Sequence, residues 1–359
     1  MRILSNEDVQ QVLTAEECMS VLEVAYKEFT SGLAANRPRT HTYLPFVDEQ
    51  FPGFHYRFKS QEGGNVSSGV WALRIASEMT GEETLASGAK CRRLLPAATG
   101  NKYCGLITLY STRKLEPLAI IQDSHIQKMR CSATSALGIR ALSNAESRVA
   151  GLFGTGWQAN SHLEYLLLVR PSIEEVRVYS PIKADREEFA RKWKEKTGKE
   201  IVAVDHPRKA VLGCQIITCA TNTTDPCFDG MWLEPGAHVT SITHPDGTVR
   251  KRELDDVTYD RADTIIVLSR EQIHHDSQTD ILGPVERGRK RLDELGELGE
   301  LLSGKVSGRT RQDQITLFAN NTGMGLQFAA VGARVLELAE RRGLGNVVPT
   351  DWFLEETPP

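Results

Sequence analysis

The segment from residue 149 to residue 168 constrains the fold more than any other part of this sequence. Its first five residues, Val149-Ala150-Gly151-Leu152-Phe153, are typical of a buried strand, and Gly154-Thr155-Gly156 and a helical pattern follow. The first glycine permits a tight turn, and the second lets the backbone approach a pyrophosphate at the start of the helix. The pattern therefore predicts a dinucleotide site, with a purely structural turn as the alternative. Its expected cofactor-binding residues are Gly154, Thr155, Gly156, Gln158 and Ala159.

Apolar runs recur at regular intervals after this turn. A charged helical pattern over residues 185–196 separates the first two of them. Strands that alternate with helices at this spacing pair in parallel and carry helices on both faces of the sheet. We therefore expect an α/β fold with a doubly wound Rossmann domain. The runs lie at residues 176–179, 201–204, 214–218, 238–242 and 264–268.

The two ends of the chain have a different texture. A helical pattern follows the cap-like Ser5-Asn6-Glu7-Asp8 and closes at Gly32. From residue 37 to residue 118, apolar and polar residues alternate in short runs divided by Gly and Pro, which is typical of antiparallel strands. Helical patterns cover residues 126–142 and 326–341. The chain thus has a strand-rich first part, an α/β middle and a C-terminal helix that could complete either domain.

Composition excludes several classes of function. The 359 residues suit two domains of ordinary size, and 43 basic residues against 47 acidic ones give a net charge of −4. This balance offers no electrostatic footprint for nucleic acid or for an anionic membrane surface. No apolar run approaches the roughly 20 residues of a membrane span, and the N-terminus lacks a signal-peptide pattern, so we expect a cytoplasmic protein.

The seven cysteines contain no Cys-x-x-Cys pair. The closest two, Cys214 and Cys219, stand in an apolar run at a spacing that suits no usual zinc motif. We therefore expect no metal site and interpret both thiols as small buried hydrophobic groups.

The end of the second α/β strand bears on the choice between NAD and NADP. An acidic residue there binds the ribose 2′-hydroxyl of NAD, whereas a polar or cationic site accommodates the 2′-phosphate of NADP. The sequence reads Tyr179-Ser180-Pro181-Ile182-Lys183, without an acid. Ser180 and Lys183 therefore favour NADP, although Lys183 can also be an ordinary exposed residue. We expect Thr221 and Asn222, which follow the fourth strand, to contact the ribose or pyrophosphate.

Three arginines stand in apolar or aromatic surroundings: Arg39, Arg74 and Arg130. A guanidinium binds a carboxylate through two parallel N–H bonds, so these residues suit an amino-acid or keto-acid substrate. The alternative for each of them is a surface or salt-bridged arginine.

Several segments together resemble the ornithine cyclodeaminase/mu-crystallin family of NAD(P)-dependent proteins, over nearly the whole chain. The first half contributes Glu116-Pro117-Leu118-Ala119, Met129-Arg130-Cys131-Ser132-Ala133-Thr134-Ser135-Ala136 and the glycine turn. The second half contributes Ala220-Thr221-Asn222-Thr223, Pro235-Gly236-Ala237-His238-Val239, Thr316-Leu317-Phe318, Asn321-Thr322-Gly323 and Pro349-Thr350-Asp351-Trp352-Phe353. The resemblance implies an α+β substrate-binding and dimerisation domain over residues 1–125, completed by 316–359, and a Rossmann NAD(P)-binding domain over 126–315.

The resemblance also implies roles for the arginines. Arg130 and Arg39 match family arginines on the substrate carboxylate, whereas Arg74 stands where the family usually has a lysine near the substrate amine or carbonyl. Arginine is always protonated, so Arg74 can hold a carboxylate or polarise an oxygen but cannot shuttle a proton. Lys59 on a neighbouring strand is our candidate to replace the family lysine.

A second departure follows the family histidine at His238. Cyclodeaminases place a catalytic aspartate a few residues beyond it, and here Asp246 lies near that place but not clearly in register, in a segment that is longer than usual. The alternative is that Asp246 is only a turn residue of Pro245-Asp246-Gly247. The neighbouring His244 could act as an acid or base, or be merely exposed.

By this resemblance, the reaction is hydride transfer between NAD(P) and the α-carbon of a small amino acid, imine or keto acid. We favour an amino-acid dehydrogenase or imine/ketimine reductase, with Arg74, Asp246 and Lys59 as catalytic candidates. The alternatives are an ornithine cyclodeaminase, which forms proline and ammonia, and a mu-crystallin-like ligand-binding protein without turnover. Both departures argue against a cyclodeaminase.

The strand-rich part carries apolar residues that would be an aggregation liability if they were left open, namely Phe54, Tyr56, Phe58, Trp71 and Leu73. Pairing with the same segment of a second copy covers them around a two-fold axis. We therefore expect a homodimer, as the family resemblance also implies, with closure onto the chain's own C-terminal helix as the alternative.

Overall fold

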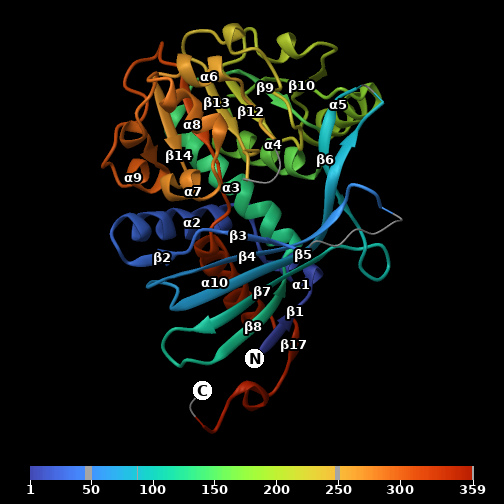
Figure 1. Ribbon diagram of the computed structural model, residues 1–359, viewed down its shortest axis with the longest axis vertical. Coiled ribbons are helices and arrows are strands. Elements are labelled where there is room, and N and C mark those ends of the chain that lie inside the picture. The colour runs from blue at the N-terminus through green and yellow to red at the C-terminus, as the bar shows by residue number, and fades with distance from the viewer. Residues whose placement is uncertain (45–50, 87, 247–250, 358–359) are drawn as a thin grey trace. The chain divides into compact units, whose positions relative to one another are not determined.

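The computed structural model describes residues 1–44, 51–86, 88–246 and 251–357, and it divides into two compact units (Figure 1). Unit 1 comprises Met1–Gly81, Leu94–Arg130 and Gly323–Pro359, and unit 2 comprises Glu82–Arg93 and Cys131–Thr322. The chain therefore passes into unit 2 after Arg130 and returns after Thr322, whereas the sequence suggested boundaries after residues 125 and 315.

Unit 1 is built on a nine-stranded mixed sheet. The strand order is β17-β1-β8-β7-β5-β4-β2, with β3 paired to β4 and β6 paired to β5. Its helices and strands, of which β5, β6 and α3 continue into unit 2, are β1 (Arg2–Leu4), α1 (Asn6–Val12), α2 (Ala15–Thr30), β2 (Ala34–Asn36), β3 (Thr40–Tyr43), β4 (His55–Asn65), β5 (Val70–Thr84), β6 (Lys90–Leu95), β7 (Cys104–Ser111), β8 (Pro117–Gln122), α3 (Ser124–Leu142), α10 (Gly325–Arg341), β17 (Asn346–Val347) and η4 (Thr350–Phe353).

The N-terminal helical pattern forms two helices instead of one. Ser5 and Asp8 make the expected capping box at the start of α1, with the Ser5 hydroxyl and backbone facing the Asp8 carboxylate. The chain then leaves helical geometry at Leu13, and the Thr14 hydroxyl accepts from the backbone of Glu17 to start α2. Leu13 is buried although it lies outside both helices, so the apolar spacing continues across the break. The sequence pattern therefore did not reveal that the helix is interrupted there.

The helix α10 covers one face of the unit 1 sheet and contacts β4, β7 and α2 (Figure 1). Its first turn lies directly on β4: a Cβ on Gly325 would come within 2.0 Å of the Glu62 carbonyl carbon, and one on Gly63 within 2.6 Å of the Leu326 nitrogen. Only glycine permits this approach. It brings the start of α10 against the β4 residues that carry polar side chains on the same face.

The opposite face of this sheet carries apolar side chains. Alternate residues along a strand point to opposite faces, so Tyr56 and Phe58 of β4 lie away from the buried Arg57 and Gln61. Phe58, Leu106 and Tyr110 are exposed by 37%, 36% and 42%.

Unit 2 is a doubly wound domain around an eight-stranded parallel sheet, as expected. The strand order is β11-β10-β9-β12-β13-β16-β14-β15. Its elements are β9 (Val149–Phe153), α4 (Trp157–Val169), β10 (Glu175–Tyr179), α5 (Lys183–Thr197), β11 (Glu200–Ala203), η1 (Pro207–Ala210), β12 (Ile216–Cys219), η2 (Gly230–Trp232), β13 (His238–Ser241), α6 (Asp256–Arg261), β14 (Thr264–Val267), α7 (Arg270–His275), α8 (Thr279–Glu286), η3 (Leu292–Glu294), β15 (Gly296–Glu297), α9 (Leu298–Leu302) and β16 (Thr316–Ala319).

Two apolar cores fill the space on the two faces of this sheet. On one face α4 and α5 pack on alternate residues of β9 and β10, around Leu152, Val176 and Val178. On the other face a larger core surrounds Phe153 and Ile217 and extends to α6 and α8. The order reverses at β9, which is flanked by β10 on one side and β12 on the other. In open parallel sheets, ligands bind beyond the carboxyl ends of the strands at such a reversal.

Within the residues that the structure describes, no helix is both long enough and apolar enough to cross a membrane.

Candidate active site

The glycine turn after β9 has the geometry of a phosphate-binding turn. Gly154 has a φ of +105°, and a Cβ there would lie 2.5 Å from the Ala220 carbonyl oxygen, so only glycine fits. Gly156 caps α4 without a side-chain hydrogen bond, and a Cβ on it would meet nothing within 4 Å. The space beside Gly156 is thus open, which fits the approach of a pyrophosphate to the start of α4. Ala159 is fully buried beneath the turn, so a small residue is required there.

The residues expected beside the adenosine ribose follow β10. Ser180 is buried, whereas Lys183 is exposed at the start of α5 and lies 3.8 Å from Glu187. A second cation, missed by sequence reasoning, stands one turn further on: Arg186 donates to the Ser180 carbonyl oxygen at 2.9 Å. The end of β10 therefore has two cations of α5 close by.

Thr221 and Asn222 follow β12, next to the glycine turn. A Cβ on Gly154 would lie 3.3 Å from Cγ2 of Thr221, so the two loops are in contact. The Asn222 side chain donates to the Arg92 carbonyl oxygen at 3.0 Å, which fastens the residues around β6 to this loop. Thr221 instead bonds to Glu253, a buried carboxylate that sequence reasoning did not single out.

Within unit 1, a row of polar side chains lies on the sheet face that α10 covers. Arg57 of β4 forms an ion pair with Glu78, its cross-strand neighbour on β5. Arg74 of β5 donates to Asp123 through Nε at 3.0 Å and also through Nη2, and to Oε1 of Gln61 through Nη1 at 3.1 Å. Each of these arginines is therefore held by a carboxylate.

Arg130 of α3 reaches the same cluster. Its guanidinium donates to Oε1 of Gln127 at 2.7 Å and to Oε1 of Gln327 at 2.9 Å. Both guanidinium groups lie over the ring of Phe328, with the central carbons of Arg130 and Arg74 at 5.3 and 5.6 Å from its centroid. Arg74 and Arg130, which the sequence could not place together, thus share one aromatic ring.

The donors of this cluster converge over Gly323. A Cβ on Gly323 would lie 2.4 Å from Nε2 of Gln61 and 2.9 Å from both terminal nitrogens of Arg130. Nε2 of Gln61 is buried and has no hydrogen-bond partner among the described residues. A buried donor without a partner is costly, and a ligand atom that accepts its hydrogen bond would remove this cost. Gln61 carried no motif that could have revealed it before its strand pairing was known.

Lys59 lies two residues before Gln61 on the same face of β4, and it is half-buried. Its Nζ forms no hydrogen bond or ion pair with any residue of the described ranges. Burial lowers the pKa of the Lys59 ammonium well below its ordinary value, and the charges of Arg74 and Arg39 lower it further. Arg39, half-buried just before β3, is close enough to act on Lys59 through its charge. A titratable group perturbed in this way is typical of active sites.

Asp246 and His244 are both buried in unit 2. Gly247, the last residue of the alternative turn Pro245-Asp246-Gly247, lies outside the described residues. The carboxylate of Asp246 forms an ion pair with Lys251 at 2.5 Å. Nδ1 of His244 lies 2.7 Å from Asp280, and its Nε2 lies 3.2 Å from the hydroxyl of Ser241 at the end of β13.

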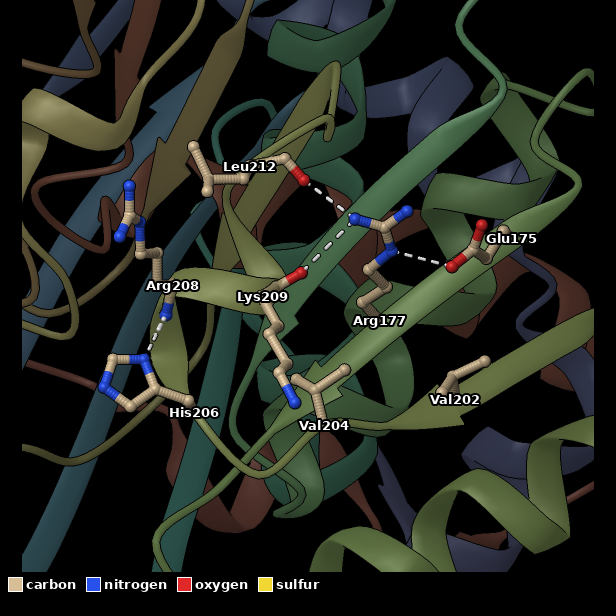
Figure 2. Close-up of a pocket in the computed structure, with 8 residues that line it drawn as sticks. All are labelled: Glu175, Arg177, Val202, Val204, His206, Arg208, Lys209 and Leu212. Carbon is tan, nitrogen blue, oxygen red and sulfur yellow. Dashed lines mark hydrogen bonds and ion pairs between the residues drawn. The ribbon is translucent and has the colours of Figure 1, made fainter.

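A hollow of about 540 Å³ lies elsewhere on unit 2, over β10, β11 and η1 (Figure 2). Arg177 is one of its lining residues and donates to Glu175 at 2.7 Å and to the Leu212 carbonyl oxygen at 2.7 Å. The guanidinium is thus occupied in joining β10 to the residues after η1. The hollow opens on the face of the sheet and not at the glycine turn.

The described ranges contain no group of three or more His, Cys, Asp or Glu side chains that could hold a metal ion. Cys214 and Cys219 are buried as expected, and burial raises the pKa of the Cys214 thiol to about 12.

A doubly wound sheet with an open glycine turn at the reversal of its strand order is typical of NAD(P)-dependent oxidoreductases. The model of the ornithine cyclodeaminase/mu-crystallin family matches residues 86–342, and the chain belongs to this family.

Similar proteins include several enzymes. A Δ1-pyrroline-2-carboxylate reductase of Bacillus cereus is 27% identical over 354 residues, which are 97% of this chain and 99% of the relative. An uncharacterised cyclodeaminase of Sinorhizobium fredii is 30% identical over 259 residues, 70% of this chain and 74% of the relative. The solved structure of Thermococcus litoralis Δ1-pyrroline-2-carboxylate reductase with NADH and L-proline has a TM-score of 0.81 at 25% identity, and the match covers 97% of this chain and all of that one.

Proposed function

We propose that this protein is an NAD(P)H-dependent reductase of small α-imino acids, working in reverse as an amino-acid dehydrogenase. The observation that carries the proposal is the convergence of Arg130 and the unpartnered Nε2 of Gln61 over Gly323. Such a set of donors, backed by Arg74, suits a carboxylate attached to the reacting carbon. The similar reductases act on a substrate of this class, as their names state.

The bound nicotinamide would supply the hydride in reduction and accept it in oxidation. The residues of this chain orient the α-carbon and move the proton. In reduction the α-carbon would receive that hydride, the C=N electron pair would move to the nitrogen, and the nitrogen would take one proton. We assign this proton to Lys59, because its lowered pKa lets it exchange a proton nearer neutral pH than an ordinary lysine.

Arg39, Arg74 and Arg130 hold the substrate in this proposal. Arg74 is fixed by Asp123 and remains charged, so it anchors the substrate carboxylate or polarises an oxygen without exchanging protons. Asp246 remains a second candidate for the base that takes the amine proton, with Lys251 as its ion-pair partner.

A cyclodeaminase is the second enzymatic candidate, since a cyclodeaminase is among the similar proteins. Against it stand the arginine at position 74 and the pairing of Asp246 with Lys251, which occupies the carboxylate that would hold a substrate amine. A ligand-binding protein without turnover is the other alternative. The perturbed Lys59 argues against it, because a lysine whose pKa is lowered in this way is typical of active sites.

Our cofactor proposal is NADP(H) in preference to NAD(H). The end of β10 carries no acid, and Lys183 and Arg186 of α5 stand beside it. A 2′-phosphate is an anion that such cations bind. The glycine turn, Gln158, Thr221 and Asn222 complete the proposed cofactor site.

We also propose a cytoplasmic homodimer. The apolar face of the unit 1 sheet around Phe58, Leu106 and Tyr110 suits burial against a second copy. Seven cysteines without a Cys-x-x-Cys pair suit a reducing compartment.

The deciding experiment follows absorbance at 340 nm with a panel of small amino acids, cyclic imino acids and keto acids plus ammonia. Each is paired with NADPH, NADH or the oxidised cofactor. We expect cofactor-stoichiometric turnover with an α-imino or α-amino acid. Formation of proline and ammonia from ornithine without net change of cofactor would replace the reductase by a cyclodeaminase, and no turnover with tight ligand binding would favour the binding protein.

A further inference from the structure

We propose that Glu253 is a positioning residue whose carboxylate fixes the loops after β12 and β13 in the arrangement that binds the dinucleotide. The inference rests on the cofactor site proposed above and adds to it a residue that does not itself touch the cofactor.

Both oxygens of the Glu253 carboxylate are fully engaged. Oε1 accepts from the backbone nitrogen of Thr221 at 2.6 Å and from its hydroxyl at 2.8 Å. Oε2 accepts from the backbone nitrogens of Ile242 at 2.7 Å and Thr243 at 2.9 Å. The Thr243 hydroxyl donates in turn to the Thr221 carbonyl oxygen at 2.7 Å, which closes the cross-link between the two loops.

The hydrogen bonds of Glu253, called the Glu253 clamp below, lie beyond the last paired residues of β12 and β13. The pairing of β12 with β13 ends at Cys219 and Ser241, so Thr221, Ile242 and Thr243 lie beyond the ladder between these two strands. Buried backbone N–H groups need an acceptor, and the fully buried Glu253 supplies it. Without it, three backbone donors at the carboxyl edge of the sheet would be left unsatisfied.

This edge is the one that meets the cofactor. Strand β12 is the neighbour of β9, and the loop after β12 touches the glycine turn through Ala220 and Thr221. Fixing Thr221 therefore also fixes one wall of the Gly154 turn. The loop after β13 lies one strand further, on the side away from β10, which is where the second half of a dinucleotide extends.

The clamp works only while the carboxylate is ionised. A proton on either oxygen would become a donor facing N–H groups that are themselves donors. Burial raises the pKa of Glu253 above its ordinary value, against the effect of the backbone hydrogen bonds. Cys219 of β12 and Tyr259 of α6 interact electrostatically with Glu253. Burial raises the pKa of both groups, so both stay uncharged at neutral pH. The cross-link should therefore fail on mild acidification, at a pH above that of an ordinary glutamate.

The test is a fluorescence titration of the full chain with NADH, whose pyrophosphate does not titrate in the range used, for wild type and Glu253→Gln. The amide keeps the shape but leaves only one acceptor oxygen, so two of the four bonds are lost. We expect the Kd for NADH to rise about 10-fold or more at pH 7.5. Between pH 7.5 and pH 5, the Kd of wild type should rise toward that of the variant, whose own Kd stays nearly constant.

Glu297→Gln is the matched control. Glu297 is a glutamate of unit 2 that accepts a backbone N–H from Arg270 and has a pKa raised by burial, but it lies at β15 on the far edge of the sheet. Its variant should bind NADH with the wild-type Kd even where thermal stability falls. Should Glu253→Gln not fold, Thr243→Val removes only the hydroxyl bond to Thr221 and should raise the Kd about 3-fold.

Equal Kd values for wild type and the Glu253 variant, or for wild type and Thr243→Val where only that variant folds, would overturn the positioning role while leaving the cofactor site intact. A wild-type protein that binds neither NADH nor NADPH would overturn the cofactor site itself, and the inference with it.

Discussion

Nη1 of Arg74 donates to Oε1 of Gln61 at 3.1 Å across β5 and β4, and this bond decides which way the Gln61 amide points. With the oxygen taken, Nε2 faces Gly323 and the terminal nitrogens of Arg130. Arg74 thus orients the neutral amide N–H donors of Gln61 toward Gly323, where the charged guanidinium of Arg130 also lies. Arg74 and Gln61 therefore act as one unit in presenting a hydrogen-bond donor over Gly323.

Lys59→Met should lower kcat by about 10²- to 10⁴-fold, the usual loss when a general acid or base is removed. Thermal stability should stay the same or rise, because the variant replaces a half-buried amine, whose desolvation is unfavourable, with an apolar side chain. Steady-state kinetics and thermal melting measure the two effects. Lys102→Met, at an exposed lysine of unit 1, is the control that should change neither. An inactive variant with clearly reduced stability would instead assign Lys59 a structural role.

Gly323→Ala should raise the KM for the imino acid about 10-fold or more, since the added methyl group would lie 2.4 Å from Nε2 of Gln61. Displacing even one charged hydrogen bond to the substrate costs about 1.5–3 kcal/mol. Cofactor affinity serves as the internal control, because the glycine turn belongs to unit 2. A constant KM in a folded variant would contradict the assignment of the donors over Gly323 to substrate binding.

Lys183→Ala should raise the Kd for NADPH by about 3- to 10-fold, the effect of losing one exposed charge-assisted contact. The Kd for NADH should not change, as NADH has no 2′-phosphate. Titration of both cofactors into one preparation gives the ratio directly. A parallel loss of both affinities, or a wild type that prefers NADH, would contradict the assignment of NADP.

Phe58→Glu should convert the proposed dimer to a monomer of 39.9 kDa, because it places a charge in the apolar sheet face. Light scattering at micromolar concentration measures the mass of wild type and variant. Lys114→Glu, an exposed change in unit 1 away from β4, is the control. A monomeric wild type would remove the dimer from the proposal.

Acid should destabilise the protein through His238. Burial lowers the pKa of this imidazole to about 3, and Thr316 and Thr240 satisfy its two nitrogens. The unfolded chain binds this proton below about pH 6.5 and the folded chain does not, so stability is lost as pH falls from about 6.5 toward 3. The loss attributable to this group is about 1.4 kcal/mol per pH unit. Urea unfolding of wild type and His238→Asn at pH 7 and pH 5 tests it, and an equal pH dependence in both would contradict it.

The α/β strands and the glycine turn could be predicted because they depend on local patterns. Val149–Phe153 is a continuous apolar run, and a Gly-x-Gly turn after it has few structural uses. The α/β fold class is confirmed in the eight-stranded parallel sheet. The break at Leu13 was missed for a physical reason: helical spacing resumes in phase on its other side, and only the Thr14 cap marks it.

Gln61 and Glu253 were beyond prediction for another reason. Each owes its place to partners distant in sequence, since Gln61 meets Arg74 through strand pairing and Glu253 meets Thr221 across 32 positions. A glutamine or glutamate in isolation is most often a solvated surface residue, and no local pattern distinguishes these two. The arginines, in contrast, could be singled out by their apolar surroundings, although not brought together.

The Glu253 clamp has a consequence for how proteins of this design diverge. Thr243 and Glu253 are bonded to each other, so the two ends of the segment between them are held at one fixed point. Residues added to or removed from this segment would leave the bonds of Glu253 to Thr221, beside the glycine turn, in place. The segment includes the buried polar residues His244 and Asp246. Cofactor recognition can thus be inherited unchanged while the length and chemistry of the intervening segment are free to evolve. An enzyme of this design can therefore change its substrate without giving up its cofactor site.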